Sequence, residues 1–247
     1  MGSSTETLKK PSLSAAALKW IALVSMLIDH ATEVLYVGSA RAGAPLFGWI
    51  TYLVLRGVGR LAFPIYAFLL AEGFYHTRSR AQYLLRLGVF ALLSELPFDF
   101  AFQWTLFDFG YQNVFCTLFL GLLAIWLFER ATGGDLPGCG LWRGALGFAA
   151  ILGMAALARL DRTDYGELGV LIIAAMGVFR NRPLPRAAVS AALLYAASPL
   201  EAVSFVDYGL FALYNGRRGR QPKYFFYAFY PGHLLLLCLL RRLLYGL

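Results

Sequence analysis

Charged side chains are scarce in this chain of 247 residues, where Asp, Glu, Lys and Arg together make up 15%. Soluble domains carry about 25% charged residues and about 45–50% apolar ones, whereas the apolar share here is 59%. The composition therefore excludes an ordinary soluble domain and indicates an integral membrane protein. The net charge of +8 does not indicate nucleic-acid binding, because the basic residues fall in alternate loops between apolar runs.

Cysteine and histidine are also rare, with three residues of each. Cys116 and Cys238 lie in apolar runs and Cys139 lies in a loop. This odd count has no regular spacing, so the sequence predicts neither a disulfide framework nor a cysteine metal site. The histidines show no H-x-x-x-H or E-x-x-H spacing, so no metal is expected.

The apolar runs predict an all-α, polytopic transmembrane bundle of about nine spans, forming a single domain over residues 1–247. Residues 1–12 are polar and are expected to be a flexible cytoplasmic N-terminus. The first apolar run has no cleavage site after it and is expected to remain as a span. Residues 46–58 are interpreted as a short interfacial or re-entrant helix, and 206–215 is doubtful as a span. The expected spans are 18–37, 60–76, 81–103, 114–128, 144–159, 167–179, 187–203, 206–215 and 224–245.

Lys and Arg gather in alternate connections, whereas the connections at 104–113 and 199–206 have none. The positive-inside rule then predicts a cytoplasmic N-terminus. Arg241 and Arg242 fit less well, and we expect that they snorkel to the outer interface or that one short segment does not cross. The basic connections are 1–12, 77–80, 130–143, 180–186 and 217–223.

Asp29 and His30 lie inside the first apolar run, at residues 18–37. Asp29 is ~15 Å along a helix from Lys19, which puts it near the midplane of a ~30 Å hydrocarbon layer. A carboxylate at that depth costs roughly 2.5–3.5 kcal/mol and must face protein or water. An imidazole beside a carboxylate is a common general-base arrangement. The competing interpretation is a satisfied polar contact between helices, and the further polar groups below favour function.

Other ionisable groups fall at similar depths in the remaining runs. Pro97 removes a backbone hydrogen bond and predicts a kink in the third span, and broken helices at membrane depth normally line a cavity. The last span combines aromatic residues, a Pro-Gly break and His233. Since lipid does not tolerate such groups, we expect one interior cavity that includes His30. Its other expected members are Arg60, Glu72, Arg86, Glu95, Asp99 and His233.

The loop at 217–223 is the most basic of the chain and precedes an aromatic cluster at 225–230. These cations could hold phosphate groups, and the aromatic rings could stack on an adenine. The competing interpretations are membrane topology for the cations and an interfacial belt with core packing for the rings. His76, Arg78, Arg217, Arg218, Arg220, Lys223, Tyr227 and Tyr230 form the candidate phosphate and nucleotide group.

Several stretches resemble the TraX family, integral membrane proteins named for a pilin N-acetylase. The most specific are GRLAFPIYAFLLAEGFYHT at 59–77 and SELPFD at 94–99. MLIDH at 26–30, NVFCTL at 113–118 and YPGHL at 230–234 also match. Shorter matches are 18–23, 83–87, 164–166, 214–216 and 223–227, so the resemblance covers almost the whole chain except 129–143.

The TraX family looks related to a wider group of multi-span acyltransferases, and this resemblance implies an acyl donor, the side from which it binds and a catalytic histidine. It implies an enzyme of the bacterial plasma (inner) membrane that takes acetyl from cytoplasmic acetyl-CoA. His30 would be the catalytic base or acyl carrier, with Asp29 supporting it, and Glu72 or Glu95 is an alternative partner. The acceptor would be an amine or hydroxyl of a pilin-like protein or a surface glycan.

Two other classes remain open on the sequence. Buried carboxylates, imidazoles and broken helices also suit a proton-coupled transporter or channel, although no inverted repeat is visible. A structural scaffold of a secretion assembly would not need intramembrane charges. The acceptor, the acyl chain length and the oligomeric state stay open.

Overall fold

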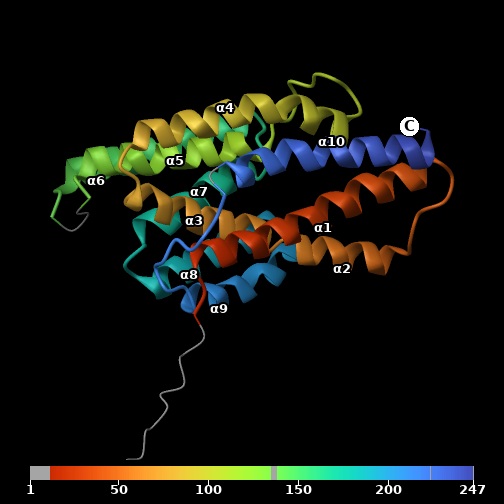
Figure 1. The fold of residues 1–247 in the computed structure, drawn as a ribbon. Helices are drawn as coiled ribbons and strands as arrows, with labels where there is room; N and C mark the ends of the chain where they lie inside the picture. The colour runs from red at the N-terminus through yellow and green to blue at the C-terminus, as the bar shows by residue number, and fades with distance from the viewer. Residues whose placement is uncertain (1–11, 135–137, 223, 247) are drawn as a thin grey trace, which may run out of the picture.

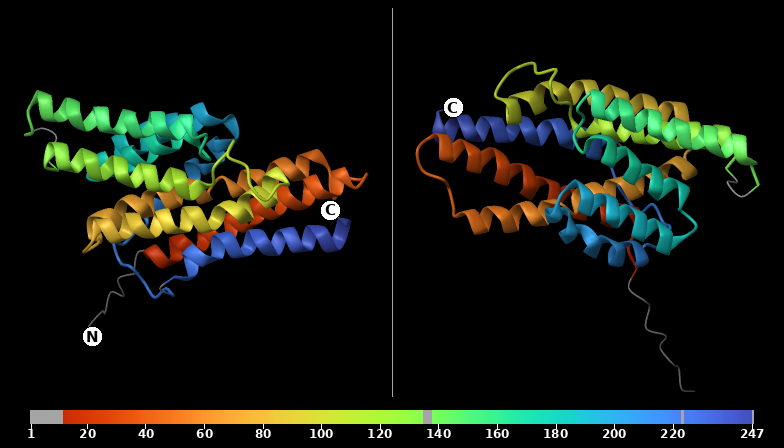
Figure 2. Two further views of the ribbon diagram at one scale, coloured as in Figure 1. Left: turned by 90° about the horizontal axis from the view of Figure 1, so that it is seen from above. Right: turned by 180° about the vertical axis from the view of Figure 1, so that it is seen from behind.

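The computed structural model describes residues 12–134, 138–222 and 224–246, which form an elongated bundle of helices (Figures 1 and 2). Within these residues β-structure is limited to two isolated bridges, so the predicted all-α bundle is confirmed. A π-helix, η1, continues α4, and a 3₁₀-helix, η2, precedes α9. The elements are α1 (Ala15–Arg41), α2 (Trp49–Gly59), α3 (Ala62–His76), α4 (Arg80–Phe98), η1 (Asp99–Gln103), α5 (Val114–Thr132), α6 (Leu141–Leu160), α7 (Gly166–Val178), α8 (Pro183–Ala197), η2 (Pro199–Val206), α9 (Asp207–Ala212) and α10 (Phe225–Tyr245).

Two groups of helices make up the bundle. In one, α1 packs against α2, α3 and α10, and in the other α5 packs against α4, α6 and α7. Small residues permit close approach in the second group, because a Cβ at Gly121 of α5 would overlap Ile173 of α7. Helix α3 packs against α1, α5 and α7 and so links the groups.

Four helical stretches of the described chain are long and apolar enough to cross a membrane. They are α1, Trp49–His76, α5 and α6. The second stretch contains both α2 and α3, so residues 46–58 are not a helix separate from the predicted span at 60–76. The helix bends at Arg60 and Leu61 and continues.

Other predicted span boundaries also need correction. The span predicted at 187–203 ends as α8 before Ser198 and Pro199, and η2 starts there. Helix α9 has six residues, too few to cross a membrane, which resolves the doubt about 206–215. The break predicted at Pro231 is absent, because α10 continues through it. The disruption predicted at Pro97 does occur, as α4 changes there into the π-helix η1.

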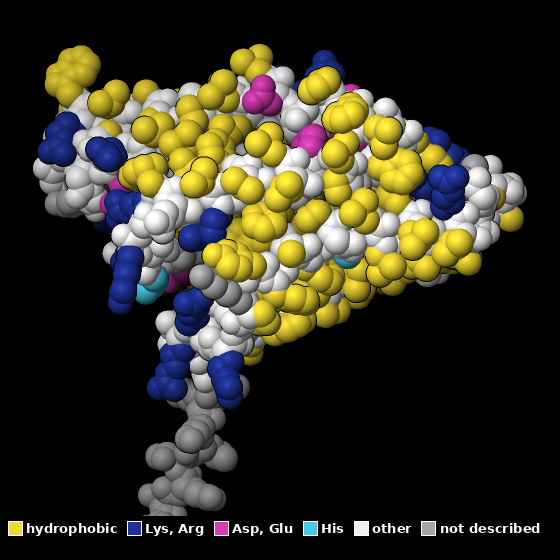
Figure 3. Space-filling model, turned by 45° about the horizontal axis from the view of Figure 1, so that its top comes forward, with side chains coloured by type: hydrophobic (Ala, Val, Ile, Leu, Met, Phe, Trp, Pro, Cys, Tyr) yellow, Lys and Arg dark blue, Asp and Glu magenta, His cyan; other side chains and the backbone are white. Residues whose placement is uncertain are grey.

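The basic connections lie together at one end of the bundle. The turns between α3 and α4, α5 and α6, and α7 and α8 lie at the end where α1 begins, as does the loop 213–222 (Figure 1). Figure 3 shows Lys and Arg gathered at that end, with hydrophobic side chains spread over the middle of the same face. This distribution matches a bundle whose middle lies in lipid.

Arg241, one of the two unexpected basic residues near the C-terminus, is buried, whereas Arg242 is exposed. Arg241 is 1% exposed and donates hydrogen bonds to the carbonyls of Phe100 and Ala101 in η1, at 2.9 and 2.8 Å. Its guanidinium also stacks 3.7 Å from the ring centre of Trp104. These carbonyls lie where the α-helical pattern is broken, so Arg241 satisfies acceptors that would otherwise lose partners. Arg241 therefore does not snorkel to the interface, and the other alternative, a short segment that does not cross, agrees with the six residues of α9.

Candidate active site

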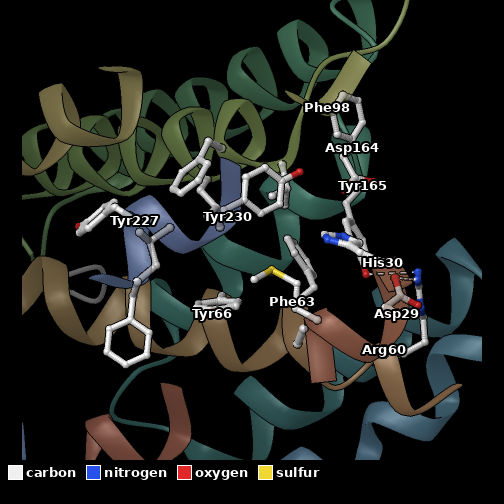
Figure 4. A pocket seen from close by; sticks show the side chains of 18 of the residues that line it. Asp29, His30, Arg60, Phe63, Tyr66, Phe98, Asp164, Tyr165, Tyr227 and Tyr230 are labelled. Carbon is white, nitrogen blue, oxygen red and sulfur yellow. Dashed lines mark hydrogen bonds and ion pairs between the residues drawn. The ribbon is translucent and has the colours of Figure 1, made fainter. Parts of the chain in front are cut away.

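A cavity of about 280 Å³ opens inside the bundle beside α1 (Figure 4). Its long wall is the sector of α1 that carries Lys19, Met26, Asp29, His30 and Glu33. Those residues recur at helical spacing, so the cavity extends roughly 20 Å along α1. The other walls are mostly apolar and aromatic side chains of α3, α4, η1, α5 and α10, together with residues of α2 and of the loops before α5 and α7.

An ion cluster forms one end of the cavity around Asp29, which is 7% exposed. Its Oδ2 lies 2.6 Å from Arg60 Nη2 and 2.8 Å from Arg56 Nη1. Arg60 also reaches Glu201 at 3.2 Å, and Glu33 accepts a hydrogen bond from Tyr52 at 2.6 Å. Buried charges stay ionised when opposite charges and hydrogen bonds surround them.

The bend between α2 and α3 creates this cluster. The carbonyls of Val58 and Gly59 lie at the bend and accept hydrogen bonds from the Ser25 hydroxyl of α1. Gly59 faces Asp29 so closely that a Cβ there would overlap the carboxylate. Glycine therefore lets α1 approach the bend, and Arg60 follows directly, within reach of Asp29.

His30 lies next to the ion cluster but has a different partner from Asp29. Its Nδ1 lies 2.7 Å from Nε2 of His233 on α10. The rings of Phe102 and Tyr230 pack edge-to-face with its imidazole, at centroid distances of 5.4 and 5.7 Å. Phe102 belongs to η1, so the broken end of α4 places an aromatic wall against the imidazole.

Tyr165 has a strained backbone beside the same cluster. Its φ is +64°, a region that residues other than glycine rarely adopt. Its ring stacks on Phe63 at 3.8 Å, and its hydroxyl lies 3.4 Å from Arg60. The preceding residue, Asp164, accepts a hydrogen bond from Tyr111. Strained residues held by packing often occur at functional sites.

The opposite end of the cavity is basic. Lys19 donates to Gln221 at 2.8 Å. The loop 213–222 is fixed to the start of α1, because the backbone amides of Ala15 and Ala16 donate to the carbonyls of Arg217 and Arg218. The side chains of Arg217, Arg218 and Arg220 are exposed at this end.

The family model described as TraX protein matches residues 14–241. The chain belongs to the TraX family. It is also 30% identical over 243 residues to a protein of Dichelobacter nodosus named "Probable fimbrial assembly protein FimC, serogroup H1". The match covers 91% of this chain and 94% of that relative. No solved structure matches.

The structure brings some of the candidate residues of this TraX-family chain to the cavity. Asp29, His30, Arg60, Tyr227 and Tyr230 line it, and His233 contacts it through His30. The exposed Arg217, Arg218 and Arg220 lie on the loop fixed beside its basic end. Lys223 lies outside the described residues.

Three carboxylates predicted to share this cavity do not line it. Glu72 pairs with the exposed His76 at 3.9 Å. Glu95 accepts from Asn113, the residue that caps α5, and Asp99 accepts from the Asp108 amide. The one-cavity prediction is therefore wrong for these three, and neither Glu72 nor Glu95 is the hydrogen-bond partner of His30. One oxygen of Glu95 and one of Asp99 therefore serve the start of α5 and the loop before it, and the other oxygen of each is buried without a hydrogen-bond partner among the described residues.

Two candidate cations are not themselves part of the cavity lining. Arg86 lies 5.6 Å from the ring centre of Tyr83, which does line the cavity, and Arg78 is exposed in the turn after α3. Among the residues that the structure describes, His, Cys, Asp and Glu form no cluster of three or more suited to a metal ion.

Several lining residues were missing from the candidates. Tyr66 could have been found from its place one turn from Ala62 and Phe63 in the specific match at 59–77. Arg56 lies in the segment 46–58, which was interpreted as a short interfacial or re-entrant helix and contributed no candidate residue. Tyr111, Asp164 and Tyr165 lie in loops whose position against α1 had no sequence signal, although 164–166 matched the family pattern.

Proposed function

We propose that this chain is a membrane-embedded acyltransferase that moves an acyl group, first of all acetyl, from acyl-CoA to an amine or hydroxyl acceptor. The observation that carries the proposal is the course of the cavity. It joins a basic end at Lys19 to the imidazole of His30. Of the two nitrogens of that ring, Nδ1 makes a hydrogen bond with His233. Such a passage suits a donor with phosphates at one end and a reactive group at the other.

The length of the passage supports a CoA thioester. Lys19 and His30 are separated by ~16 Å along α1. The chain between the CoA diphosphate and its sulfur has twelve bonds, equivalent to four extended residues, or ~14 Å. If the phosphates are held near Lys19 and this chain, the arm of CoA, lies along the cavity, the thioester reaches His30.

Each side chain has a defined part in this proposal. Arg217, Arg218 and Arg220 would attract the phosphates, together with Lys19 and Lys223. Tyr227 and Tyr230 would wall the arm. The hydroxyl of Tyr66 is buried without a hydrogen-bond partner among the described residues and lines the cavity. It would donate to the thioester carbonyl as negative charge develops on that oxygen.

His30 would be the general base. As the acceptor attacks the thioester carbonyl, its proton moves to Nε2 of His30. Breaking of the carbon–sulfur bond then releases the CoA thiolate, which takes that proton. The paired charges of Asp29, Arg56 and Arg60 would hold the surrounding helices in place, so Asp29 acts on the site without contacting the imidazole through a hydrogen bond.

The name of the Dichelobacter relative, a probable fimbrial assembly protein, directs the proposal for the acceptor. We favour an exported pilin-like protein, with a surface glycan as the second candidate. The basic end would face the cytoplasm of a bacterium, in the inner membrane, and the acceptor would enter from the end that carries the α1–α2 loop.

Purified protein in lipid nanodiscs, given acetyl-CoA labelled on the acetyl group, tests this function. We expect CoA binding and slow release of the label, or its transfer to added acceptor peptide. His30→Gln and His30→Ala should each lower turnover by ~10²–10⁴-fold while CoA binding persists. Variants that keep more than about a tenth of turnover would exclude His30 as the base. Proton flux without CoA binding would instead favour a transporter.

A further inference from the structure

The two hydrogen bonds of His233 determine where its protons are. Its Nδ1 lies 2.8 Å from the backbone carbonyl of Phe229, one turn earlier on α10. A carbonyl oxygen accepts and cannot donate, so Nδ1 of His233 must carry a hydrogen. The ring is 4% exposed. Its partners in the described chain are a carbonyl and another imidazole, with no carboxylate ion pair, and a buried imidazolium without a counter-charge is costly. His233 is therefore neutral, and its Nε2 is an acceptor.

This assignment fixes the proton of His30 in turn. Nδ1 of His30 lies 2.7 Å from Nε2 of His233, so it must be the donor. The two rings are nearly parallel, with an interplanar angle of 6°, which suits a hydrogen bond between nitrogens in the ring planes. Neutral His30 then has its lone pair on Nε2. Within the described residues, Nδ1 is the nitrogen of His30 that makes a hydrogen bond.

We propose that His233 is a positioning residue that holds His30 in the tautomer with its proton on Nδ1 and its lone pair on Nε2. We call the chain of hydrogen bonds from the Phe229 carbonyl through His233 to His30 the relay. It remains intact when His30 accepts a proton, because Nδ1 still donates to His233. This role rests on the proposed acyl transfer for its use, but not for its existence, because the hydrogen bonds alone define the tautomers.

Nitrogen NMR of the imidazoles tests the relay without any enzyme assay. The chain has three histidines, and a His76→Gln variant assigns the exposed one. Protein labelled with ¹⁵N-histidine in nanodiscs should show both His30 and His233 protonated on Nδ1 at neutral pH. Free imidazoles favour the other tautomer, so this pattern is distinctive. A signal for His30 protonated on Nε2 would overturn the proposal whatever the activity.

A pair of variants separates positioning from packing. His233→Phe keeps an aromatic ring but removes the acceptor, so His30 should lose its fixed tautomer. His233→Gln supplies an amide oxygen that can accept from Nδ1. We expect at least a tenfold fall in kcat with little change in KM for His233→Phe, and recovery of most of it in His233→Gln. Equal losses in both variants, with the His30 tautomer unchanged, would contradict the relay.

The two kinds of failure are distinguishable. Wild-type protein that transfers no acyl group but shows both Nδ1 tautomers would refute the proposed function and leave the relay standing. Active protein in which His30 titrates freely between tautomers would refute the relay and leave the acyltransferase standing.

Discussion

The two ends of the cavity carry charge in opposite ways. At the end where α1 begins, Lys19 is hydrogen-bonded to a neutral side chain, and the exposed Arg217, Arg218 and Arg220 form no ion pair with a carboxylate of the described chain. At the other end, Asp29 binds both Arg56 and Arg60, and Glu201 binds Arg60.

That difference separates two roles for charge. Exposed cations without carboxylate partners gain most from an anionic ligand, so the basic end suits substrate attraction. The arginines of the ion cluster are already paired with carboxylates, so an anionic ligand would have to compete with those pairs, while Oδ1 of Asp29 and Oε2 of Glu201 have no hydrogen-bond partner among the described residues. We infer that the cluster holds α1 against the α2–α3 bend, and that it positions the imidazole beside it.

The largest expected effect comes from breaking the ion cluster. Arg60→Met would leave Asp29 and Glu201 without their shared cation in a buried site, at a cost of ~3–5 kcal/mol. The variant should show a strongly lowered thermal unfolding midpoint in nanodiscs. Arg56→Met is the matched comparison, because Arg56 is more exposed than Arg60. Asp29 keeps one arginine in either variant, whereas Glu201 loses its arginine only in Arg60→Met. Equal loss in both variants would contradict a central role for Arg60.

The close approach at the bend gives a second test. Gly59→Ala would push the Asp29 carboxylate from its arginines, and overpacking of this kind costs ~1–3 kcal/mol. Gly153→Ala in α6 is the control, since a Cβ there meets open space. We expect lower unfolding temperature and lower turnover in Gly59→Ala and neither change in Gly153→Ala. A Gly59→Ala protein as stable as the wild type would mean that α1 can move away from the bend.

The sequence predicted where the helices lie in the chain better than it predicted which side chains they bring together. Apolar runs gave the bundle, and the depth of Asp29 and His30 in α1 followed from helix rise alone. Pro97 was expected to kink the third span, and α4 changes into the π-helix η1 two residues after it, whereas Pro231 was expected to break the last span and lies inside the continuous α10. A proline removes one donor, but neighbouring packing decides whether the helix ends there.

Partner choice was the part that the sequence could not supply. Asp29 was expected to support His30, with Glu72 or Glu95 as the alternative partner because successive helix residues point ~100° apart, and none of the three is the hydrogen-bond partner of His30. Asp29 faces α2 and α3, and His30 faces α10. His233 lies about 200 residues away, and its pairing depends on how α10 packs against α1. The same holds for Glu95, whose burial looked functional but which accepts a hydrogen bond from Asn113, the residue that caps the start of α5.

A smaller effect is expected at the basic end. Arg218→Glu should raise the dissociation constant for CoA about five- to tenfold at low salt, since it replaces an attractive charge with a repulsive one. High salt should reduce the difference by screening. Arg182→Glu is the control, because Arg182 is also exposed but lies on the loop between α7 and α8. Equal effects at both sites would mean that net charge, rather than this loop, governs affinity.

The most direct test of the account is where a reactive CoA thioester analogue modifies the protein. Bromoacetyl-CoA carries an alkylating group at the position of the transferred acyl group, so it labels the nucleophile that the donor reaches. We predict labelling of His30 on Nε2, located by peptide mass spectrometry and prevented by excess CoA. Labelling of the exposed His76 in place of His30, or labelling of His30 that CoA does not prevent, would contradict a passage that leads the donor from Lys19 to His30.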